Sequence, residues 1–219
     1  MIDLPSIVST PNGPMVVGSS PELLKRLLVG VDRALREIGL DLDGWFRPGL
    51  SRETIAGQLR AIGLESPELS VWFSWHNGYR PSPLPSGEPP IPNFVMGTLE
   101  DAVARYRQSR SFVPPAQMQE SLGAIDFDFG AGEGWLRLAS DSEGLAIYAK
   151  DSISPQIRYA NGDFEYAPET MYRAVSLCTY ATWWLFGLRN GGYTWDVDAS
   201  SWTMDIERLA PSQVEARFW

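Results

Sequence analysis

The sequence predicts an α+β fold: helices near the N-terminus, a central, mainly antiparallel sheet of meander type, and a covering helix near the C-terminus. Apolar residues recur at helical spacing between residues 21 and 38, whereas apolar and polar residues alternate between 134 and 149. A second apolar segment with helical spacing runs from about 168 to 188. Helices that precede a run of strands, followed by a further helix, are typical of the α+β class.

The chain of 219 residues is long enough for one domain with long loops. Residues 1–20 contain three prolines and an Asn-Gly pair, and we expect them to form an irregular arm. Residues 21–219 are then predicted to form a single domain. Within that domain we expect residues 193–219 to be an irregular tail rich in aromatic side chains.

The first predicted helix has clear start and stop signals. Ser20 can cap it, Pro21 suits the first helical position, and Gly39 can end it. Two shorter helices are expected at 51–63 and 66–78. The last of these should end at Asn77 and Gly78, because this pair readily adopts the left-handed conformation found at helix ends.

A proline-rich loop at 81–93 separates these helices from the predicted sheet. A short strand is expected at 94–96, and Thr98 to Asp101 resemble a capping box for another helix. Strands at 134–139 and 144–149 form a predicted hairpin, with a third strand at 157–159. In the last helix, we expect Trp183 and Trp184 to point in two directions, which would leave one ring exposed.

The formal net charge of −9 argues against DNA, RNA and anionic lipid as partners, and favours a basic protein. Cys178 is the only cysteine, so an intramolecular disulfide is excluded, and its apolar neighbours predict a buried, unreactive thiol. A basic and apolar leader is absent, as is a run of about 20 apolar residues that could span a membrane. We therefore expect a cytoplasmic protein.

Few residues in the sequence suggest catalysis. His76 is the only histidine, which excludes multi-histidine metal centres, and its place at a predicted helix end favours a structural role. Asp126 and Asp128 alternate with phenylalanines, so both carboxylates would share one face of a strand. Such a pair could bind a metal ion or hydrolyse a glycoside, but an edge strand with an acidic outer face is the favoured interpretation.

We expect no catalytic residue, no metal and no cofactor. Four exposed acids are the candidates for contact with a protein partner: Asp126, Asp128, Asp141 and Glu143. Five residues are expected to determine the fold: Trp72, Asn77, Gly78, Trp135 and Gly144.

In order and spacing, these segments resemble the SUKH superfamily (the Smi/Knr type) over about residues 52–190. The matching segments are a short helix at 55–63, then ESPELSVWFSWHNG, TLEDAVARY, the hairpin WLRLASDSEGLAIYA and a final helix from Pro168. The chain departs from the family pattern at Gln58, where many relatives carry glutamate, and at Ser66 in place of a leucine.

The resemblance implies a non-catalytic protein-binding domain. Bacterial relatives are mostly immunity proteins of polymorphic toxin systems, often encoded beside nuclease toxins, and fungal relatives regulate cell-wall synthesis. The leading expectation is therefore an immunity protein that neutralises a basic toxin domain. A regulatory scaffold of the same family and a carboxylate- or metal-dependent hydrolase are the alternatives.

Overall fold

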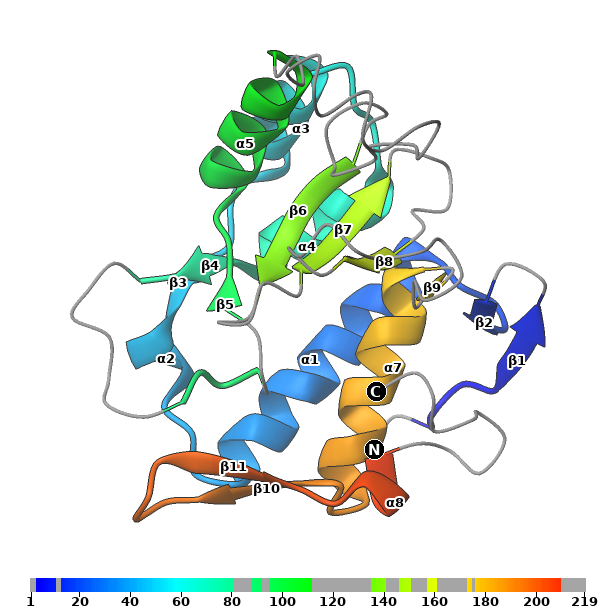
Figure 1. Ribbon diagram of the computed structural model, residues 1–219, viewed down its shortest axis with the longest axis vertical. Coiled ribbons are helices and arrows are strands. Elements are labelled where there is room, and N and C mark those ends of the chain that lie inside the picture. Colours follow the sequence, from blue (N-terminus) through cyan, green and yellow to red (C-terminus); the bar gives the residue numbers. More distant parts are fainter. Residues whose placement is uncertain are drawn as a thin grey trace, which may run out of the picture.

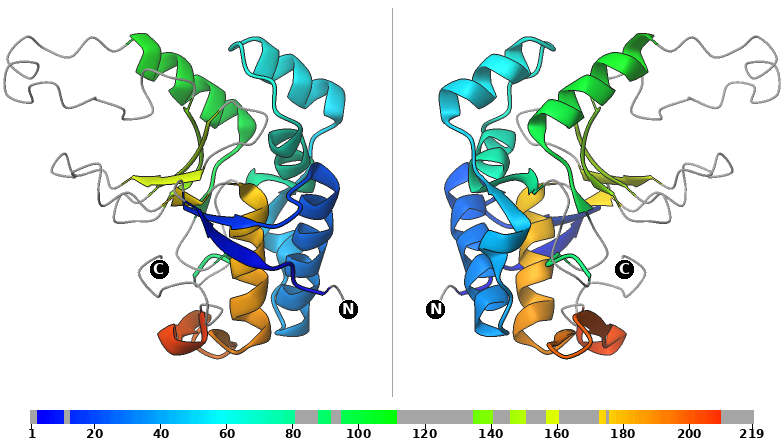
Figure 2. Two further views of the ribbon diagram at one scale, coloured as in Figure 1. Left: turned by 90° about the vertical axis from the view of Figure 1, so that its right-hand side faces the viewer. Right: turned by 90° about the vertical axis from the view of Figure 1, so that its left-hand side faces the viewer.

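The computed structural model describes residues 3–10, 13–80, 88–91, 95–111, 135–140, 146–150, 157–160, 173–174 and 176–209. These residues form an α+β structure in which two long helices lie side by side beneath a five-stranded sheet (Figure 1). Figure 2 shows the same two helices from both sides, with the sheet and a further helix above them. The predicted fold class is confirmed.

Helix α1 (Pro21–Glu37) packs along helix α7 (Leu177–Arg189), and their contact is the centre of the hydrophobic core. The predicted cap of α1 is present, since the Ser20 hydroxyl accepts a hydrogen bond from Leu23 N at 3.1 Å. Helix α7 begins later than expected, because Ser176 caps its first turn and residues 173–174 form a strand instead.

The expectation that Trp183 or Trp184 would expose its ring is wrong. Both rings are buried, at 1% and 2% exposure. Helix α7 is covered on several sides, by α1, by β2 and by the C-terminal elements, so it has no solvent-facing stripe at these positions.

Three short helices follow α1: α2 (Leu42–Trp45), α3 (Arg52–Arg60) and α4 (Pro67–Trp75). Helix α4 does not run to Asn77 and Gly78 as predicted. It ends at Trp75, and the chain continues directly into strand β4 (His76–Tyr79), which pairs antiparallel with β3 (Phe46–Pro48). The Asn-Gly pair therefore lies in a strand.

The main sheet is an antiparallel meander in the order β5-β6-β7-β8-β9, as predicted. Its strands are β5 (Val95–Met96), β6 (Trp135–Ser140), β7 (Ala146–Lys150), β8 (Ile157–Ala160) and β9 (Arg173–Ala174). Helix α5 (Leu99–Ser111) leaves the end of β5 and packs against β6 and α3. Thr98 caps this helix as predicted, since Asp101 N donates to Thr98 Oγ1 at 3.1 Å.

Both ends of the described chain are more regular than expected. The N-terminal segment contains a hairpin of β1 (Ile7–Thr10) and β2 (Gly13–Val16), not an irregular arm. The C-terminal segment contains a hairpin of β10 (Tyr193–Asp196) and β11 (Ser201–Met204), followed by helix α8 (Ile206–Leu209). The second hairpin lies across the lower ends of α1 and α7 (Figure 1). Among the described residues, no helix is long and apolar enough to cross a membrane.

The contact between α1 and α7 predicts different effects for two neighbouring substitutions. Leu28 is 1% exposed, so Leu28→Ala should lower the free energy of unfolding by about 2–5 kcal/mol through lost burial and a cavity. Val29 is 48% exposed, so Val29→Ala should change it by less than about 0.5 kcal/mol. Urea denaturation of both variants measures the difference, and equal losses would contradict the described packing of α1.

Candidate functional site

The acids predicted to contact a partner lie outside the described residues. This applies to Asp126, Asp128, Asp141 and Glu143, and to Gly144 among the expected fold determinants. Trp135 begins β6, but only its backbone is described.

Asn77 holds the start of helix α5. Its buried side chain accepts a hydrogen bond from Leu99 N at 2.8 Å through Oδ1, and donates to Glu100 Oε2 at 3.0 Å through Nδ2. Leu99 is the first residue of α5, so Asn77 satisfies an amide that has no partner within the helix. Predicted to end one helix, Asn77 thus supports the beginning of the next.

Gly78 allows β4 to cross the backbone beside β5 at close range. Its φ angle is 74°, in the left-handed region, and a Cβ atom there would lie 2.7 Å from the carbonyl carbon of Gly97. A side chain would therefore meet backbone that cannot rotate away. Asn77 and Gly78 together fix where α5 leaves the sheet.

Glu100 extends this junction to helix α3. Gln58 Nε2 donates to Glu100 Oε1 at 3.0 Å, while Asn77 binds the other carboxylate oxygen. Partial burial acts to raise the pKa of Glu100, but the hydrogen bonds from Asn77 and Gln58 outweigh it and hold the pKa below its usual value. The carboxylate is thus ionised and serves as a link between α3, β4 and α5.

Trp72 forms a buried contact between helices. It is fully buried in α4, and its ring lies 5.7 Å from that of Trp75 and 5.9 Å from that of Trp184, centroid to centroid. It therefore joins α4 to α7 as part of the core.

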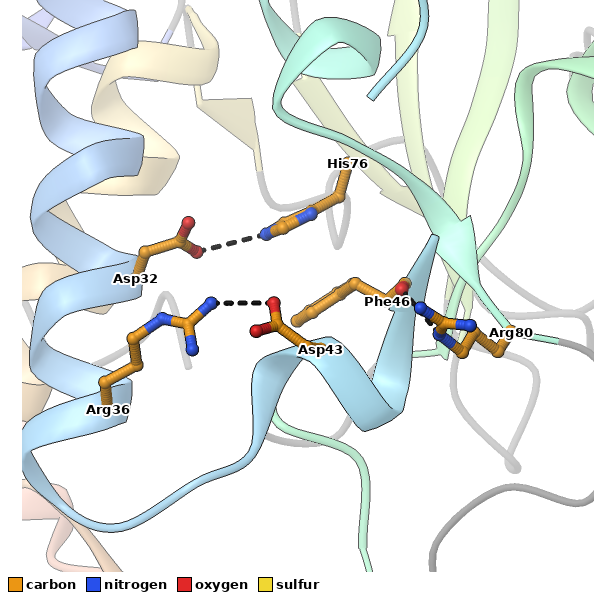
Figure 3. A network of polar contacts seen from close by, with 6 residues as sticks. All are labelled: Asp32, Arg36, Asp43, Phe46, His76 and Arg80. Carbon is orange, nitrogen blue, oxygen red and sulfur yellow. Dashed lines mark hydrogen bonds and ion pairs between the residues drawn. The ribbon is translucent and has the colours of Figure 1, made fainter. Parts of the chain in front are cut away.

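His76 joins α1 to β4 (Figure 3). Its Nε2 lies 3.2 Å from Asp32 Oδ1, and its ring stacks on Phe46 with centroids 4.2 Å apart. Close by, Arg36 and Asp43 form a second link, 2.9 Å long, between α1 and α2. Within the described residues, the hydrogen-bond partner of the His76 ring is Asp32, and the pair links α1 to β4.

Glu68 is a buried acid at the start of helix α7. It is 4% exposed and accepts a hydrogen bond from Leu177 N at 3.3 Å. Burial raises its pKa to about 7, and the bond from Leu177 only partly opposes this. Glu68 does not line either of the two described cavities. Burial, together with the charge of Glu68, raises the pKa of the nearby Cys178 thiol to about 11, which keeps that thiol unreactive.

One end of the molecule is acidic and partly apolar. The turn between β10 and β11 approaches the last turn of α1, since a Cβ atom on Gly39 would lie 3.9 Å from Val197 Cγ2. Val197 is 65% exposed, the most exposed of the large apolar side chains among the described residues. Five exposed acids lie within four residues of these two positions, and we call them with Val197 the acidic end: Glu37, Asp41, Asp43, Asp196 and Asp198.

A second surface has the opposite charge. A cavity of about 330 Å³ opens between β3, β4, β5, α5 and β6, and its lining includes four arginines. We call it the arginine pocket; the arginines are Arg47, Arg80, Arg105 and Arg137. No group of three or more metal-ligating side chains able to hold a metal ion occurs among the residues described.

A scan against protein-family models and a search of curated proteins found no match to this chain. The relation to the SUKH superfamily accordingly remains the resemblance described above.

The crossing at Gly78 can be tested with a matched pair of glycines. Gly78→Ala should lower the free energy of unfolding by about 2–4 kcal/mol, because it combines a strained φ with a clash against Gly97. Gly57→Ala, in the exposed middle of α3 with no atom within 4 Å of the new Cβ, should raise it by about 0.5–1 kcal/mol. Thermal and urea unfolding of the two variants measure both changes, and a harmless Gly78→Ala would contradict the close crossing.

The raised pKa of Glu68 predicts that the free energy of unfolding depends on pH. Its pKa is about 7 in the folded protein, against an ordinary glutamate pKa of 4.5 in the unfolded chain, so the folded state binds the proton more tightly. Stability therefore falls as the pH rises from about 4.5 through 7, by about 3 kcal/mol in total. Glu68→Gln keeps an acceptor for Leu177 N but cannot ionise, and it should remove this loss.

The measurement is the free energy of unfolding at pH 5 and pH 8. The loss between the two should be about 2–3 kcal/mol smaller in Glu68→Gln than in the unsubstituted protein. Exposed Glu65 provides the control, since Glu65→Gln should leave the loss unchanged. Identical pH profiles for all three proteins would show that Glu68 does not ionise in a buried setting.

Proposed function

We propose that this chain is a non-catalytic, cytoplasmic protein-binding domain that neutralises a toxin of a bacterial polymorphic toxin system. The resemblance of residues 52–190 to the SUKH superfamily supports the class of function. The net charge of −9 supports a basic partner, such as a nuclease domain whose surface binds phosphates.

The observation that carries the proposal is the acidic end. Interfaces combine an apolar centre with a polar rim, and the acidic end offers both kinds of group, the exposed apolar Val197 and five exposed acids. Charges of one sign on the rim accelerate the approach of an oppositely charged partner and disfavour partners of like charge. Arg36 neutralises part of this charge through its pair with Asp43, whereas exposed Asp41 and Asp198 add to it.

The turn that presents Val197 is held in a defined conformation. Asp196 Oδ1 accepts hydrogen bonds from Asp198 N and Ala199 N, each at 2.9 Å. The rings of Trp195 and Trp202, in the two strands that the turn connects, lie edge to face with their centroids 5.1 Å apart, and both pack against the core. A surface that is rigid before binding loses less conformational entropy when a partner docks.

A regulatory scaffold that binds a cellular protein would use the same kind of surface. The neighbouring gene separates the two functions, because a secreted protein with a toxin domain is expected beside an immunity gene. Catalysis by Asp126 and Asp128 with a divalent metal is the remaining alternative, and calorimetric titration with magnesium and manganese tests it. Heat of binding that disappears on Asp126→Asn with Asp128→Asn would support that alternative.

The proposal predicts that the toxin encoded beside this gene binds at a rate that falls as salt rises. Asp41→Asn with Asp198→Asn should slow association by about threefold or more at low salt and weaken its salt dependence. Glu53→Gln with Glu65→Gln removes two exposed charges outside the acidic end and should change the rate by less than about twofold. Stopped-flow or surface plasmon resonance measures both.

Protection from the toxin in co-expressing cells is the separate readout for the function itself. Cells that die despite full expression of this chain would contradict toxin neutralisation. Protection combined with a binding rate that ignores salt would contradict only the role of charge.

A further inference from the structure

We infer that the arginine pocket is a binding site for a small phosphate monoester, a site distinct from the acidic end and independent of toxin neutralisation. The first observation is the concentration of charge. In a chain with a net charge of −9, the lining of one cavity contains four arginines and a single acid, Asp101. The arginines come from β3, the end of β4, α5 and β6, so the fold and not local sequence brings them together.

Two of these arginines, Arg47 and Arg80, each donate a hydrogen bond to the backbone of the neighbouring strand. Arg47 Nε donates to the carbonyl oxygen of Tyr79 at 3.1 Å, and Arg80 Nε donates to that of Phe46, also at 3.1 Å. Phe46 and Tyr79 are paired in the β3–β4 register, so each arginine reaches across to the residue that precedes the other. The bond from Arg80 to Phe46 is visible in Figure 3.

These bonds use one donor of each guanidinium and fix its plane. The terminal N–H groups remain in a planar fork, the geometry that binds two oxygens of a phosphate at once. Backbone carbonyls orient the groups without neutralising them. Both positive charges are therefore held in place and still uncompensated by the carbonyls.

The described carboxylates neutralise the pocket only in part, since Asp101 brings one negative charge against four positive charges. None of the four arginines forms an ion pair with a described acid. Asp101 instead accepts a hydrogen bond from the Thr98 hydroxyl, at 2.9 Å through Oδ2, at the start of α5. Four like charges on one cavity repel one another, and an anion of more than one charge would remove that repulsion.

The beginning of α5 adds a favourable field but few donors. Leu99 N, Asp101 N and Ala102 N are bonded to Asn77, Thr98 Oγ1 and Thr98 O. The positive end of the helix dipole still favours an anion there. The guanidinium groups are therefore the donors that would hold the phosphate oxygens.

The shape and lining of the pocket favour an organic phosphate. Its volume of about 330 Å³ lies at the lower end of the range for small-ligand sites, and exceeds what a bare phosphate ion needs. One part of the wall is apolar, formed by Val95, Met96, Leu138 and Ala139. A phosphate carries about two charges and three acceptor oxygens, more than a single carboxylate offers to four arginines.

Isothermal titration calorimetry at constant ionic strength tests the inference, with four probes: inorganic phosphate, adenosine 5′-monophosphate, adenosine and succinate. Saturable binding is expected for the two phosphates, with the nucleotide tighter, and none for adenosine. Succinate, a dianion of carboxylates, should bind at least about tenfold more weakly than the nucleotide. Equal binding of succinate, or no saturable heat from either phosphate up to about 10 mM, would overturn the inference.

Two arginines of α5 form the matched pair of variants. Arg105→Gln removes a pocket side chain that makes no hydrogen bond or ion pair with other described residues, and should weaken nucleotide binding about tenfold or more. Arg107→Gln removes an equal charge two residues along the same helix but outside the arginine pocket, and should change affinity less than about twofold. If both variants weakened binding equally, general charge attraction would explain the binding, and a specific site in the arginine pocket would be contradicted.

A second pocket variant, in β6, tests whether the effect of Arg105→Gln is confined to α5. Arg137→Gln should also weaken nucleotide binding about tenfold. Thermal unfolding of this variant without ligand shows whether its sheet is intact. A folded Arg137→Gln protein with undiminished affinity would contradict convergence of the arginines on one ligand.

Discussion

The close crossing of β4 over the start of helix α5 is the constraint on which much of this structure depends. Gly78 lets two backbones meet at a distance that excludes any side chain, and Asn77 uses that proximity to cap α5. Glu100 then ties α5 to α3 through Gln58. If this crossing were displaced, α5 would move away from β6, and the wall of the arginine pocket that carries Arg105 would move with it.

The two charged surfaces follow from this arrangement in different ways. The acidic end combines the turn between β10 and β11 with the last turn of α1 and the beginning of α2. Two of its exposed carboxylates also have local partners, since Asp43 pairs with Arg36 and Asp196 accepts a hydrogen bond from Asp198 N. The four arginines of the arginine pocket come from four different elements, which only the sheet and the crossing bring together. Net charge does not predict the arginine pocket, because a total of −9 does not indicate where the positive residues lie.

Local signals in the sequence predicted the elements that depend on local chemistry. Neighbours in the chain determine four of these features: the Ser20 cap, the apolar stripe of α1, the Thr98 cap and the order of the strands. The end of α4 did not, because Asn-Gly suits both a helix end and a tight strand crossing, and only the partner at Gly97 decides between them. The arginine pocket was out of reach for the same reason, since Arg47 and Arg137 are far apart in sequence.

Three further elements differ from the sequence prediction although the sequence contains a pattern that indicates each of them. Ser176 carries the same serine cap as Ser20 and Ser66, and marks the true start of α7. In the sequence, Pro11-Asn12-Gly13 between two apolar stretches is typical of a hairpin connection, and the apolar stretches on either side do pair as β1 and β2. In the C-terminal hairpin, Trp195 and Trp202 face each other across β10 and β11, a cross-strand aromatic pair in a segment taken as irregular.

The junction at Asn77 also bears on how the protein ages. Asn-Gly sequences are chemically the most prone to lose the amide as ammonia, because glycine leaves room for the backbone nitrogen to attack the side chain. Here that side chain is buried and held at both ends, by Leu99 N and by Glu100, so attack requires the junction to open first. Conversion to aspartate would then place a new carboxylate directly against that of Glu100, and the same molecule would no longer close as tightly as before.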